Sequence, residues 1–350
     1  MAKLFFLLSG ENETLPAAEL TAILEAEGFA FKVKEKLDQI VRLNAAQNSV
    51  KSVHRRSAYT RICALELFTC AAQETAIMKT AGSTDFKSVL SKGESYAVRV
   101  RRIRDYAEEV GTVALEGKLG KHILQSTLKT KVNLKTPDKT FFGVLTNDRL
   151  VFGVKLTEIE PRTFSERRPR KKPFFHPSAM PSKLARCMVN LARVKVGEFV
   201  LDPFCGTGGV LIEAAFIGCR VLGFDAQRRM AVGCRKNLKH FNIESDGLVI
   251  ADARRLPITK IDHLVTDPPY GRSATTMKST TKQIVEGVLS SARPLLSSGQ
   301  LICIASPKTL NIAQIGVELG YKHLESHFAY VHRTLTREIA VFETMQGVTL

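Results

Sequence analysis

The sequence predicts an α/β protein in which a mostly parallel sheet domain follows an α+β region. From Met180 to the C-terminus, helices and apolar strands alternate, a pattern typical of a parallel sheet covered on both faces. The proline-containing, basic stretch Glu160–His176 interrupts this pattern and is predicted to be a linker with neither helix nor strand. Before it, short strands and helices alternate, which indicates an α+β region.

The elements of the α+β region follow from local periodicity, and they specify no function by themselves. Helices are expected over Leu15–Ala26, Tyr59–Cys70 and Glu108–Gln125. Strands are expected over Leu4–Leu8, Ala30–Val33, Gln39–Asn44, Tyr96–Arg102, Thr140–Leu145 and Leu150–Leu156.

In the sheet domain, apolar runs alternate with helical patterns until a final hairpin. A helix is expected over Val210–Ile217. Strands are expected over Phe199–Leu201, Val221–Phe224, Leu248–Ile250 and Ile261–Thr266, and the hairpin over Tyr321–Tyr330 and Glu338–Glu343. The hairpin supplies an antiparallel strand to an otherwise parallel sheet.

The 350 residues carry a formal net charge of +17. Residues 1–175 hold 30 Lys and Arg against 20 Asp and Glu, and the rest hold 21 against 14, so both halves are basic. A polyanion such as nucleic acid explains this charge, and so does a surplus of surface lysine that keeps the protein in solution.

Seven cysteines without a CxxC pair indicate reduced thiols, neither a disulfide frame nor a zinc site. The C-terminal histidines His323, His327 and His332 lack acidic or cysteine companions, so no metal site is expected. The apolar run Leu4–Leu8 is too short for a membrane span or a secretory signal, and no other run approaches membrane length. We therefore expect a cytoplasmic protein without membrane contact.

A glycine-rich turn follows the strand Phe199–Leu201 and runs into the helix Val210–Ile217. This arrangement lets the backbone approach a ligand closely, as in dinucleotide-binding enzymes. A carboxylate at Asp202 would repel a pyrophosphate, whereas it suits the cationic methionine portion of S-adenosylmethionine. The predicted cofactor contacts of the turn are Asp202, Phe204, Gly206, Thr207 and Gly208.

Acids also follow the next two strands. Asp225 is placed to bind ribose hydroxyls, and Asp252 to accept a hydrogen bond from an adenine amino group. Their neighbours Ala226 and Ala253 are included as cofactor contacts. A lone glycine turn is often only a tight turn, but three signals in order at three successive strand ends predict an S-adenosylmethionine pocket.

The tetrapeptide Asp267–Tyr270, with two prolines, follows the fourth strand. An exocyclic amine is a poor nucleophile because its lone pair is delocalised into the base. The Asp267 carboxylate and the Pro268 carbonyl can accept hydrogen bonds from the two N–H groups of the amine, and Asp267 can take the released proton. Tyr270 offers a ring on which a flipped base stacks, and Gly271 leaves room for it. The competing interpretation, a plain surface turn, explains the tetrapeptide only when it is taken in isolation.

These motifs resemble the class I methyltransferases that act on amino groups. The segment Phe174–Met180, followed by Lys183–Arg186 and Val189–Leu191, is similar to archaeal tRNA guanosine-N2 methyltransferases that act at position ten. In that family the segment covers the cofactor, which implies that His176 and Pro177 contact it. For His176, a helix-entry residue bound to backbone is the alternative.

The resemblance spans nearly the whole chain and implies a ferredoxin-like domain over residues 1–54, a THUMP domain over 55–158 that grasps tRNA, a basic linker over 159–175 and a Rossmann-like methyltransferase domain over 176–350. It implies transfer of one methyl group or two from S-adenosylmethionine to guanosine N2, without a metal, by a protein compatible with a monomer. Many amino methyltransferases carry asparagine where this chain has Asp267, but this guanosine family commonly carries aspartate.

Two clusters of basic residues are candidate phosphate contacts to tRNA. They are Arg99, Arg101, Arg102 and Arg104 near a strand end, and Arg167, Arg168, Arg170 and Lys171 in the linker. A solvated surface explains any one of them equally well. Three alternative functions stay open: an amino methyltransferase for DNA adenine or cytosine, one for another tRNA position or ribosomal RNA, and a non-catalytic RNA-binding protein.

Overall fold

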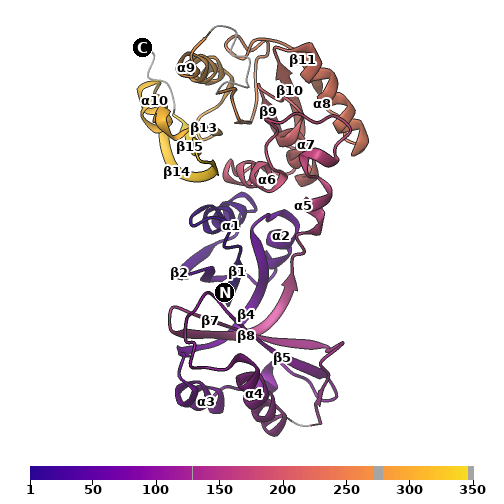
Figure 1. Ribbon diagram of the computed structural model, residues 1–350, viewed down its shortest axis with the longest axis vertical. Coiled ribbons are helices and arrows are strands. Elements are labelled where there is room, and N and C mark those ends of the chain that lie inside the picture. The colour runs from indigo at the N-terminus through magenta and orange to yellow at the C-terminus, as the bar shows by residue number, and fades with distance from the viewer. Residues whose placement is uncertain (128, 271–278, 346–350) are drawn as a thin grey trace. The chain divides into compact units, whose positions relative to one another are not determined.

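The computed structural model describes residues 1–127, 129–270 and 279–345, and it divides the chain into two compact units (Figure 1). The N-terminal unit comprises Met1–Glu11, Phe29–His54 and Thr60–Glu160. The C-terminal unit comprises Asn12–Gly28, Arg55–Tyr59 and Pro161–Leu350. The predicted domains over 1–54, 55–158, 159–175 and 176–350 are contiguous, whereas each of these units is assembled from three separate segments.

The N-terminal unit is built on an eight-stranded sheet with the order β2-β3-β1-β4-β8-β7-β5-β6. Its strands are β1 Ala2–Leu8, β2 Phe31–Leu37, β3 Ile40–Ala45, β4 Thr60–Ala71, β5 Ser95–Arg102, β6 Lys131–Val132, β7 Lys139–Thr146 and β8 Arg149–Glu158. Its helical segments are α2 Ser49–Arg56, α3 Glu74–Gly82, η1 Phe86–Ser88 and α4 Thr112–Ser126. Phe141 anchors the core under α3 and α4, where its ring stacks on Phe152 at 6.1 Å.

The prediction of a helix over Tyr59–Cys70 was wrong, because β4 occupies Thr60–Ala71. This strand lies inside the sheet and pairs antiparallel with both β1 and β8. Consecutive residues such as Cys63 and Ala64 are buried on its two faces, so the apolar residues do not alternate with a period of two. Periodicity alone does not separate such a strand from a buried helix.

The C-terminal unit contains a seven-stranded sheet with the order β11-β10-β9-β12-β13-β15-β14. Its strands are β9 Phe199–Asp202, β10 Arg220–Asp225, β11 Gly247–Ile250, β12 His263–Thr266, β13 Leu301–Pro307, β14 Tyr321–His332 and β15 Leu335–Thr344. β9 to β13 pair in parallel, and β15 runs antiparallel to both β13 and β14. The predicted α/β fold with a final antiparallel strand is therefore confirmed.

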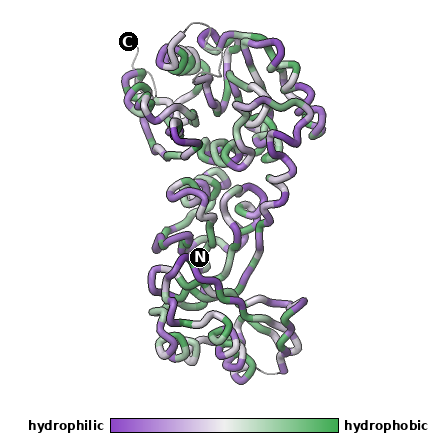
Figure 2. The backbone as a smooth tube through the Cα atoms, viewed as in Figure 1, coloured by the Kyte–Doolittle hydropathy of each residue, from purple (hydrophilic) through white to green (hydrophobic). Residues whose placement is uncertain are grey.

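Helices cover both faces of this sheet (Figures 1 and 2). They are α1 Leu15–Ala26, α5 Arg162–Glu166, α6 Ser182–Leu191, α7 Gly209–Ile217, α8 Arg228–His240, α9 Thr281–Ala292 and α10 Ile312–Glu318, with short 3-10 turns η2 Pro169–Lys171, η3 Arg293–Leu295 and η4 Lys308–Leu310. Side chains alternate along each strand: Val200 packs with α6 and α7, while Leu201 packs with α9 and α10.

Helix α1 belongs to the C-terminal unit although its sequence neighbours β1 and β2 do not. It packs on α6, and its Glu19 is fully buried. The Glu19 carboxylate accepts hydrogen bonds from the Ala58 and Tyr59 amides, both at 2.9 Å, and from Asn190 Nδ2, also at 2.9 Å. Burial raises the pKa of Glu19, and these donors oppose the shift. The network ties Asn12–Gly28 and Arg55–Tyr59 to α6.

The stretch Glu160–His176 was predicted to lack helix, which was wrong for two segments of it, α5 over Arg162–Glu166 and η2 over Pro169–Lys171. Pro161 precedes α5 and Pro169 opens η2, positions at which proline removes no helical hydrogen bond. Phe164 is buried in the core of the C-terminal unit, and Arg167 forms an ion pair with the buried Glu213. These tertiary contacts, which local composition does not report, hold the segment in place.

Candidate active site

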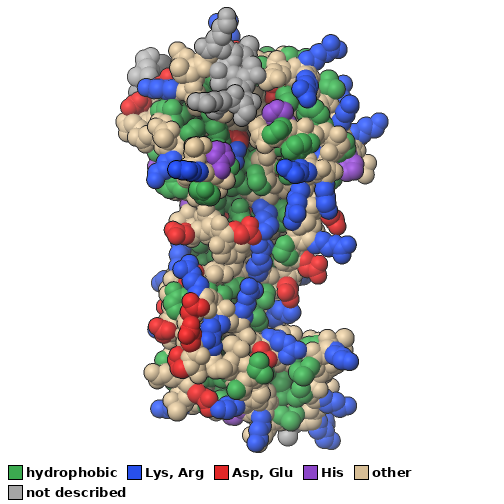
Figure 3. Space-filling view, in the orientation of Figure 1, with side chains coloured by type: hydrophobic (Ala, Val, Ile, Leu, Met, Phe, Trp, Pro, Cys, Tyr) green, Lys and Arg blue, Asp and Glu red, His purple; other side chains and the backbone are tan. Residues whose placement is uncertain are grey.

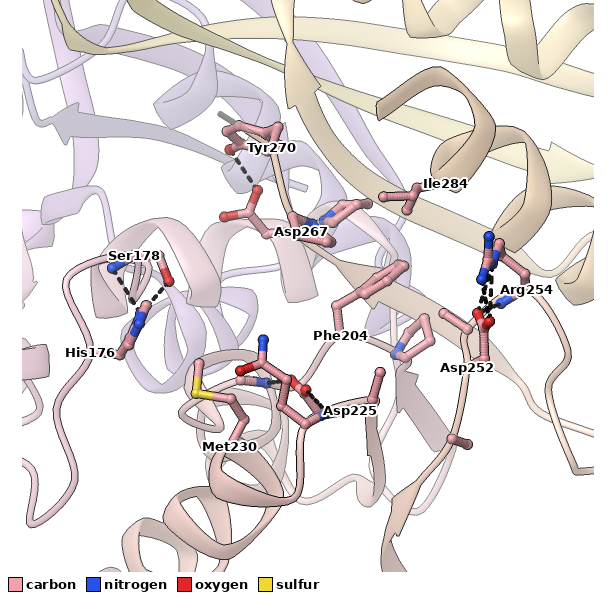
Figure 4. Close-up of a pocket in the computed structure, with 18 of the residues that line it drawn as sticks. His176, Ser178, Phe204, Asp225, Met230, Asp252, Arg254, Asp267, Tyr270 and Ile284 are labelled. Carbon is pink, nitrogen blue, oxygen red and sulfur yellow. Dashed lines mark hydrogen bonds and ion pairs between the residues drawn. The ribbon is translucent and has the colours of Figure 1, made fainter. Parts of the chain in front are cut away.

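A pocket of the C-terminal unit lies where the parallel strands end, as open α/β sheets place their sites (Figure 4). Figure 4 shows Tyr270 turned toward Asp267, and Arg254 toward Asp252. The lining residues are His176, Ser178, Pro203, Phe204, Gly206, Asp225, Ala226, Gln227, Met230, Ala251, Asp252, Ala253, Arg254, Asp267, Pro268, Pro269, Tyr270, Ile284 and Arg337. Most of the predicted cofactor and catalytic residues therefore meet in one cavity.

The glycine turn after β9 is shaped for close approach of a ligand. Gly206 and Gly208 adopt φ angles of +51° and +79°, which non-glycine residues rarely adopt. A Cβ at Gly208 would also lie 2.8 Å from Cys234 Sγ of α8, so this position excludes a side chain on two grounds. Gly206 lines the pocket, whereas the predicted contacts Thr207 and Gly208 do not and instead join the turn to α7.

Asp225 ends β10 and faces the pocket. Its carboxylate accepts hydrogen bonds from the Gly206 amide at 3.1 Å and the Gln227 amide at 2.8 Å. Burial raises the pKa of Asp225, and the two amides oppose that shift. Each carboxylate oxygen holds one amide and keeps acceptor capacity for a hydroxyl of a ligand.

Asp202 is buried at the end of β9 and is not among the residues that line the pocket. Its Oδ1 accepts hydrogen bonds from Thr266 Oγ1 at 2.6 Å and from the Phe204 amide at 3.1 Å. Burial raises the pKa of Asp202 from 3.8 to about 7, and the nearby carboxylates of Asp267 and Asp225 add to the shift. The structure thus gives Asp202 contacts that hold the turn after β9 against β12.

We predict that Asp202→Asn flattens the dependence of folding stability on pH. Between pH 3.8 and about 7 the native carboxyl keeps a proton that the unfolded chain has released. The contribution of Asp202 to wild-type stability therefore falls as pH rises through this window, by up to about 1.4 kcal/mol per pH unit. Urea titrations of both proteins from pH 4 to 8 should show the variant gaining relative stability until about pH 7. A difference that does not change with pH would contradict the assignment.

Asp252 lines the pocket but is already paired. Arg254 Nη2 lies 2.6 Å from one carboxylate oxygen of Asp252, and the Arg254 Nε lies 3.0 Å from both. This hydrogen bonding lowers the pKa of Asp252. The pair is therefore ionised. Sequence reasoning missed Arg254 because only the acid matched a cofactor role. An arginine two residues after a strand-end acid was the available signal.

The tetrapeptide Asp267–Tyr270 follows β12 and lines the pocket. Tyr270 Oη donates a hydrogen bond of 2.6 Å to Asp267 Oδ1, and Arg337 Nη2 lies 3.0 Å from Asp267 Oδ2. Arg337 Nε also donates to Tyr270 Oη, and its Cζ lies 5.7 Å from the ring centroid of Tyr270. Sequence reasoning missed Arg337, which stands 70 residues from Asp267 and enters from β15. Gly271 lies outside the described residues.

His176 lines the pocket and is also bonded within its own turn. Its Nδ1 lies 2.7 Å from Ser178 Oγ and 3.3 Å from the Ser178 amide. The predicted neighbour Pro177 is not a lining residue, and Ser178 takes that place. Asn237 of α8 anchors the preceding segment, since its side chain exchanges two hydrogen bonds of 2.9 Å with the Phe174 backbone and donates one of 2.8 Å to the Thr207 carbonyl.

The basic residues predicted to contact RNA lie on both units, and Figure 3 shows Lys and Arg side chains over the surface of each. In the N-terminal unit, Arg101 and Arg104 are exposed, and Arg104 pairs with Asp38 at 2.8 Å. Arg99 donates to the Leu134 carbonyl at 2.8 Å, and Arg102 donates to the Val110 carbonyl.

In the C-terminal unit, Arg168, Arg170 and Lys171 are exposed. Arg167 instead makes hydrogen bonds of 2.8 and 3.1 Å to Glu213, whose side chain is 1 % exposed. Its guanidinium is therefore engaged in the packing of α5 and α7, whereas the other three present cations to solvent.

Within the described residues, no group of three or more His, Cys, Asp or Glu side chains is arranged to hold a metal ion. Across the same ranges, no helix combines the length and the apolar character that crossing a membrane requires. All seven cysteines are free thiols, six of them buried.

Comparisons with solved structures define the fold. TrmN from Thermus thermophilus superposes with a TM-score of 0.55 at 19% identity and covers 98% of this chain and 100% of that one. SMU.472 complexed with SAH superposes with a TM-score of 0.55 at 16% identity over 99% of each chain. A family model for the RMKL-like methyltransferase domain matches residues 169–337, and a DNA methylase model matches residues 74–232, ending before Asp267. Fold and site together define an enzyme of the Rossmann-like methyltransferase class.

Relatives of similar length specify the family. A tRNA (guanine(10)-N2)-dimethyltransferase of Methanothermobacter thermautotrophicus is 38% identical over 342 residues, covering 97% of this chain and 99% of the relative. One from Methanocaldococcus jannaschii is 30% identical over 364 residues, with the same coverage. The chain belongs to the family of archaeal tRNA (guanine(10)-N2)-dimethyltransferases, as its motifs predicted.

Proposed function

We propose that this protein transfers methyl groups from S-adenosylmethionine to the exocyclic N2 of guanosine at position ten of tRNA, acting in the cytoplasm. The observation that carries the proposal is the position of Asp267–Tyr270 at the end of β12, in the same pocket as Asp225 and Gly206. The pocket thus combines acceptors for an amine with a site for a nucleoside.

The residues present fit S-adenosylmethionine. The backbone at Gly206 lies open to the pocket, and Asp225 keeps acceptor capacity for ribose hydroxyls. Phe204, Met230 and Ile284 supply apolar surface for a purine ring. We assign adenosine recognition to these side chains, with His176 at the entrance. S-adenosylmethionine, when bound, supplies a methyl group on a sulfonium centre that is already activated for transfer.

The protein's contribution to transfer is to hold the amine and to accept its proton. The carboxylate of Asp267 and the carbonyl of Pro268 accept hydrogen bonds from the two N–H groups of the guanine amine. These hydrogen bonds draw the nitrogen lone pair out of conjugation with the ring. Pro268 and Pro269 limit the backbone freedom of this turn, so that the acceptors are positioned before the substrate arrives. As N2 becomes positively charged, one proton passes to an Asp267 oxygen.

Delivery of the tRNA is assigned to the basic residues of both units. We propose that residues 1–54 form a ferredoxin-like domain and that residues 55–158 form a THUMP domain. The assignment of tRNA delivery is supported by exposed cations, chiefly Arg101, Arg104, Arg168, Arg170 and Lys171. Arg167 is the weakest candidate of the set, because Glu213 occupies its guanidinium. Two methyl groups are expected per guanosine, as the names of the relatives state for those proteins.

The test is transfer of labelled methyl from S-adenosylmethionine to an unmodified tRNA transcript, with the product nucleosides identified by mass spectrometry. A matched transcript carries inosine at position ten, which differs from guanosine only by lacking the 2-amino group. We expect N2,N2-dimethylguanosine from the first transcript and no label at position ten in the second. Label that appears on DNA or ribosomal RNA, or on both transcripts equally, would refute the assignment.

A further inference from the structure

Asp267, Tyr270 and Arg337, which all line the pocket, form a closed ring of hydrogen bonds. The ring runs from Arg337 Nη2 to Asp267 Oδ2 at 3.0 Å, from Tyr270 Oη to Asp267 Oδ1 at 2.6 Å, and from Arg337 Nε to Tyr270 Oη. The side chains of Arg337 and Asp267 are 9% and 16% exposed, so solvent screens the ring only weakly. The tetrapeptide follows β12, whereas Arg337 comes from the antiparallel strand β15.

The chemistry of the three groups fixes the direction of every hydrogen bond in the ring. A guanidinium only donates, so the Tyr270 oxygen accepts from Arg337 Nε. The tyrosine proton then points to Asp267 Oδ1, while Asp267 Oδ2 accepts from Arg337 Nη2. Both carboxylate oxygens therefore act as hydrogen-bond acceptors. A protonated carboxyl could accept at only one of its oxygens, because the other would carry the proton.

This arrangement counteracts the burial of the carboxyl. Burial raises the pKa of Asp267, and Arg337 and Tyr270 act against the rise. The charge of Asp267 in turn helps to raise the pKa of Asp202 at the end of β9. Burial by itself lowers the pKa of Arg337. The interactions with Asp267 and Tyr270 outweigh the effect of burial, so the pKa of Arg337 is raised. A carboxylate has about four acceptor positions, so about two remain for the substrate.

We propose that Arg337 is a positioning residue that keeps Asp267 ionised and oriented as a proton acceptor for the substrate amine. The inference rests on the proposed function, since it concerns the group that receives the amine proton. Arg337 acts through two paths, directly on Asp267 Oδ2 and indirectly by directing the Tyr270 proton toward Asp267 Oδ1. Without Arg337, the buried carboxyl takes up a proton at a higher pH than in wild type and then presents an O–H to the amine.

The experiment measures single-turnover methyl transfer to tRNA as a function of pH for wild type and Arg337→Gln. An opposite charge at this distance typically shifts a carboxyl pKa by one to three units. The midpoint of the acidic limb should therefore move up by roughly one to three pH units. Below both midpoints, activity should fall by roughly 10-fold for each unit of that shift, and raising the pH above the shifted midpoint should recover most of it.

Two further variants make the result specific. Arg337→Lys retains the charge and should keep the acidic limb near its wild-type position, which a purely structural role does not require. Arg333→Gln removes the same charge from an exposed position of the same hairpin and should leave the limb unchanged. Thermal unfolding of each variant at the assay pH identifies loss of fold, and an unfolded Arg337→Gln leaves Arg337→Lys and Arg337→Met to decide.

The proposal is overturned if Arg337→Gln lowers the rate equally at all pH values, or weakens only the binding of tRNA, because either result assigns Arg337 to packing or to base contact. Failure of the proposed function is a different result: wild type itself would then give no label on guanosine at any pH. In that case the acidic limb can be followed on whichever nucleic acid accepts the methyl group, so the role of Arg337 stays testable.

Discussion

Asp267→Ala should slow methyl transfer to tRNA by roughly 10²- to 10⁴-fold, the range typical for removal of a positioned acid–base group. The variant loses one of the two acceptors for the guanine amine and the group that takes its proton. Binding of S-adenosylmethionine should change little, because Asp225 and the Gly206 turn, which we assign to the cofactor, do not depend on Asp267. Single-turnover transfer of labelled methyl and calorimetric titration with S-adenosylmethionine measure the two quantities separately.

Asp246→Ala is the matched control, since Asp246 lies in the same unit and pairs with the exposed Arg220 outside the pocket. It should retain the wild-type rate. Asp267→Asn refines the result, because an amide keeps the size of the side chain but turns one acceptor into a donor toward Arg337 or Tyr270. A rate for Asp267→Ala within tenfold of wild type would remove Asp267 from the catalytic machinery.

Glu213→Ala should be the most destabilising single substitution among the contacts described. Glu213 of α7 is 1% exposed and binds Arg167 at 2.8 Å and Arg186 at 2.9 Å. The side chain of Arg186 is itself 4% exposed, so removing Glu213 leaves a buried cation without its partner. Breaking one side of a buried ion pair typically costs about 3–5 kcal/mol. Lys172, also buried, loses the same neighbouring carboxylate.

Chemical unfolding in urea, followed by circular dichroism, measures this effect. Glu244→Ala is the control, because Glu244 is exposed in the same unit and such changes usually stay within about 0.5 kcal/mol. A loss below about 1 kcal/mol for Glu213→Ala would mean that water reaches the two arginines after the substitution and replaces the carboxylate.

The parts of the site that are local in sequence could be predicted. The glycine turn, Asp225, Asp252 and Asp267–Tyr270 each follow a strand, and parallel strands bring such positions to one edge of a sheet. The side chains that bind these residues could not be predicted, because they are brought into place by tertiary contacts. Arg337 reaches Asp267 only because β15 returns antiparallel beside β13. The same limit applies to Asn237, which joins two loops from the middle of a helix.

The fold was predictable where periodicity was unambiguous, as for the helix Leu15–Ala26, and not where burial removed it. Consecutive residues of Thr60–Ala71, such as Cys63 and Ala64, are buried on its two faces, so its apolar residues did not alternate as those of a half-exposed strand do. The packing partner of a well-predicted element was also beyond the sequence. Nothing local to α1 indicates that Glu19 will meet Asn190, 171 residues away.

The division of the chain has a consequence for the order of events during synthesis. The path alternates between the units five times, since the segments Met1–Glu11, Phe29–His54 and Thr60–Glu160 interleave with those of the C-terminal unit. The N-terminal sheet has all its strands once residue 160 has left the ribosome. Helix α1, made among the first residues, must wait for α6 to cover its apolar side and to satisfy Glu19. Throughout that interval the nascent chain exposes the apolar side of α1, and a chaperone that binds apolar segments would bind there.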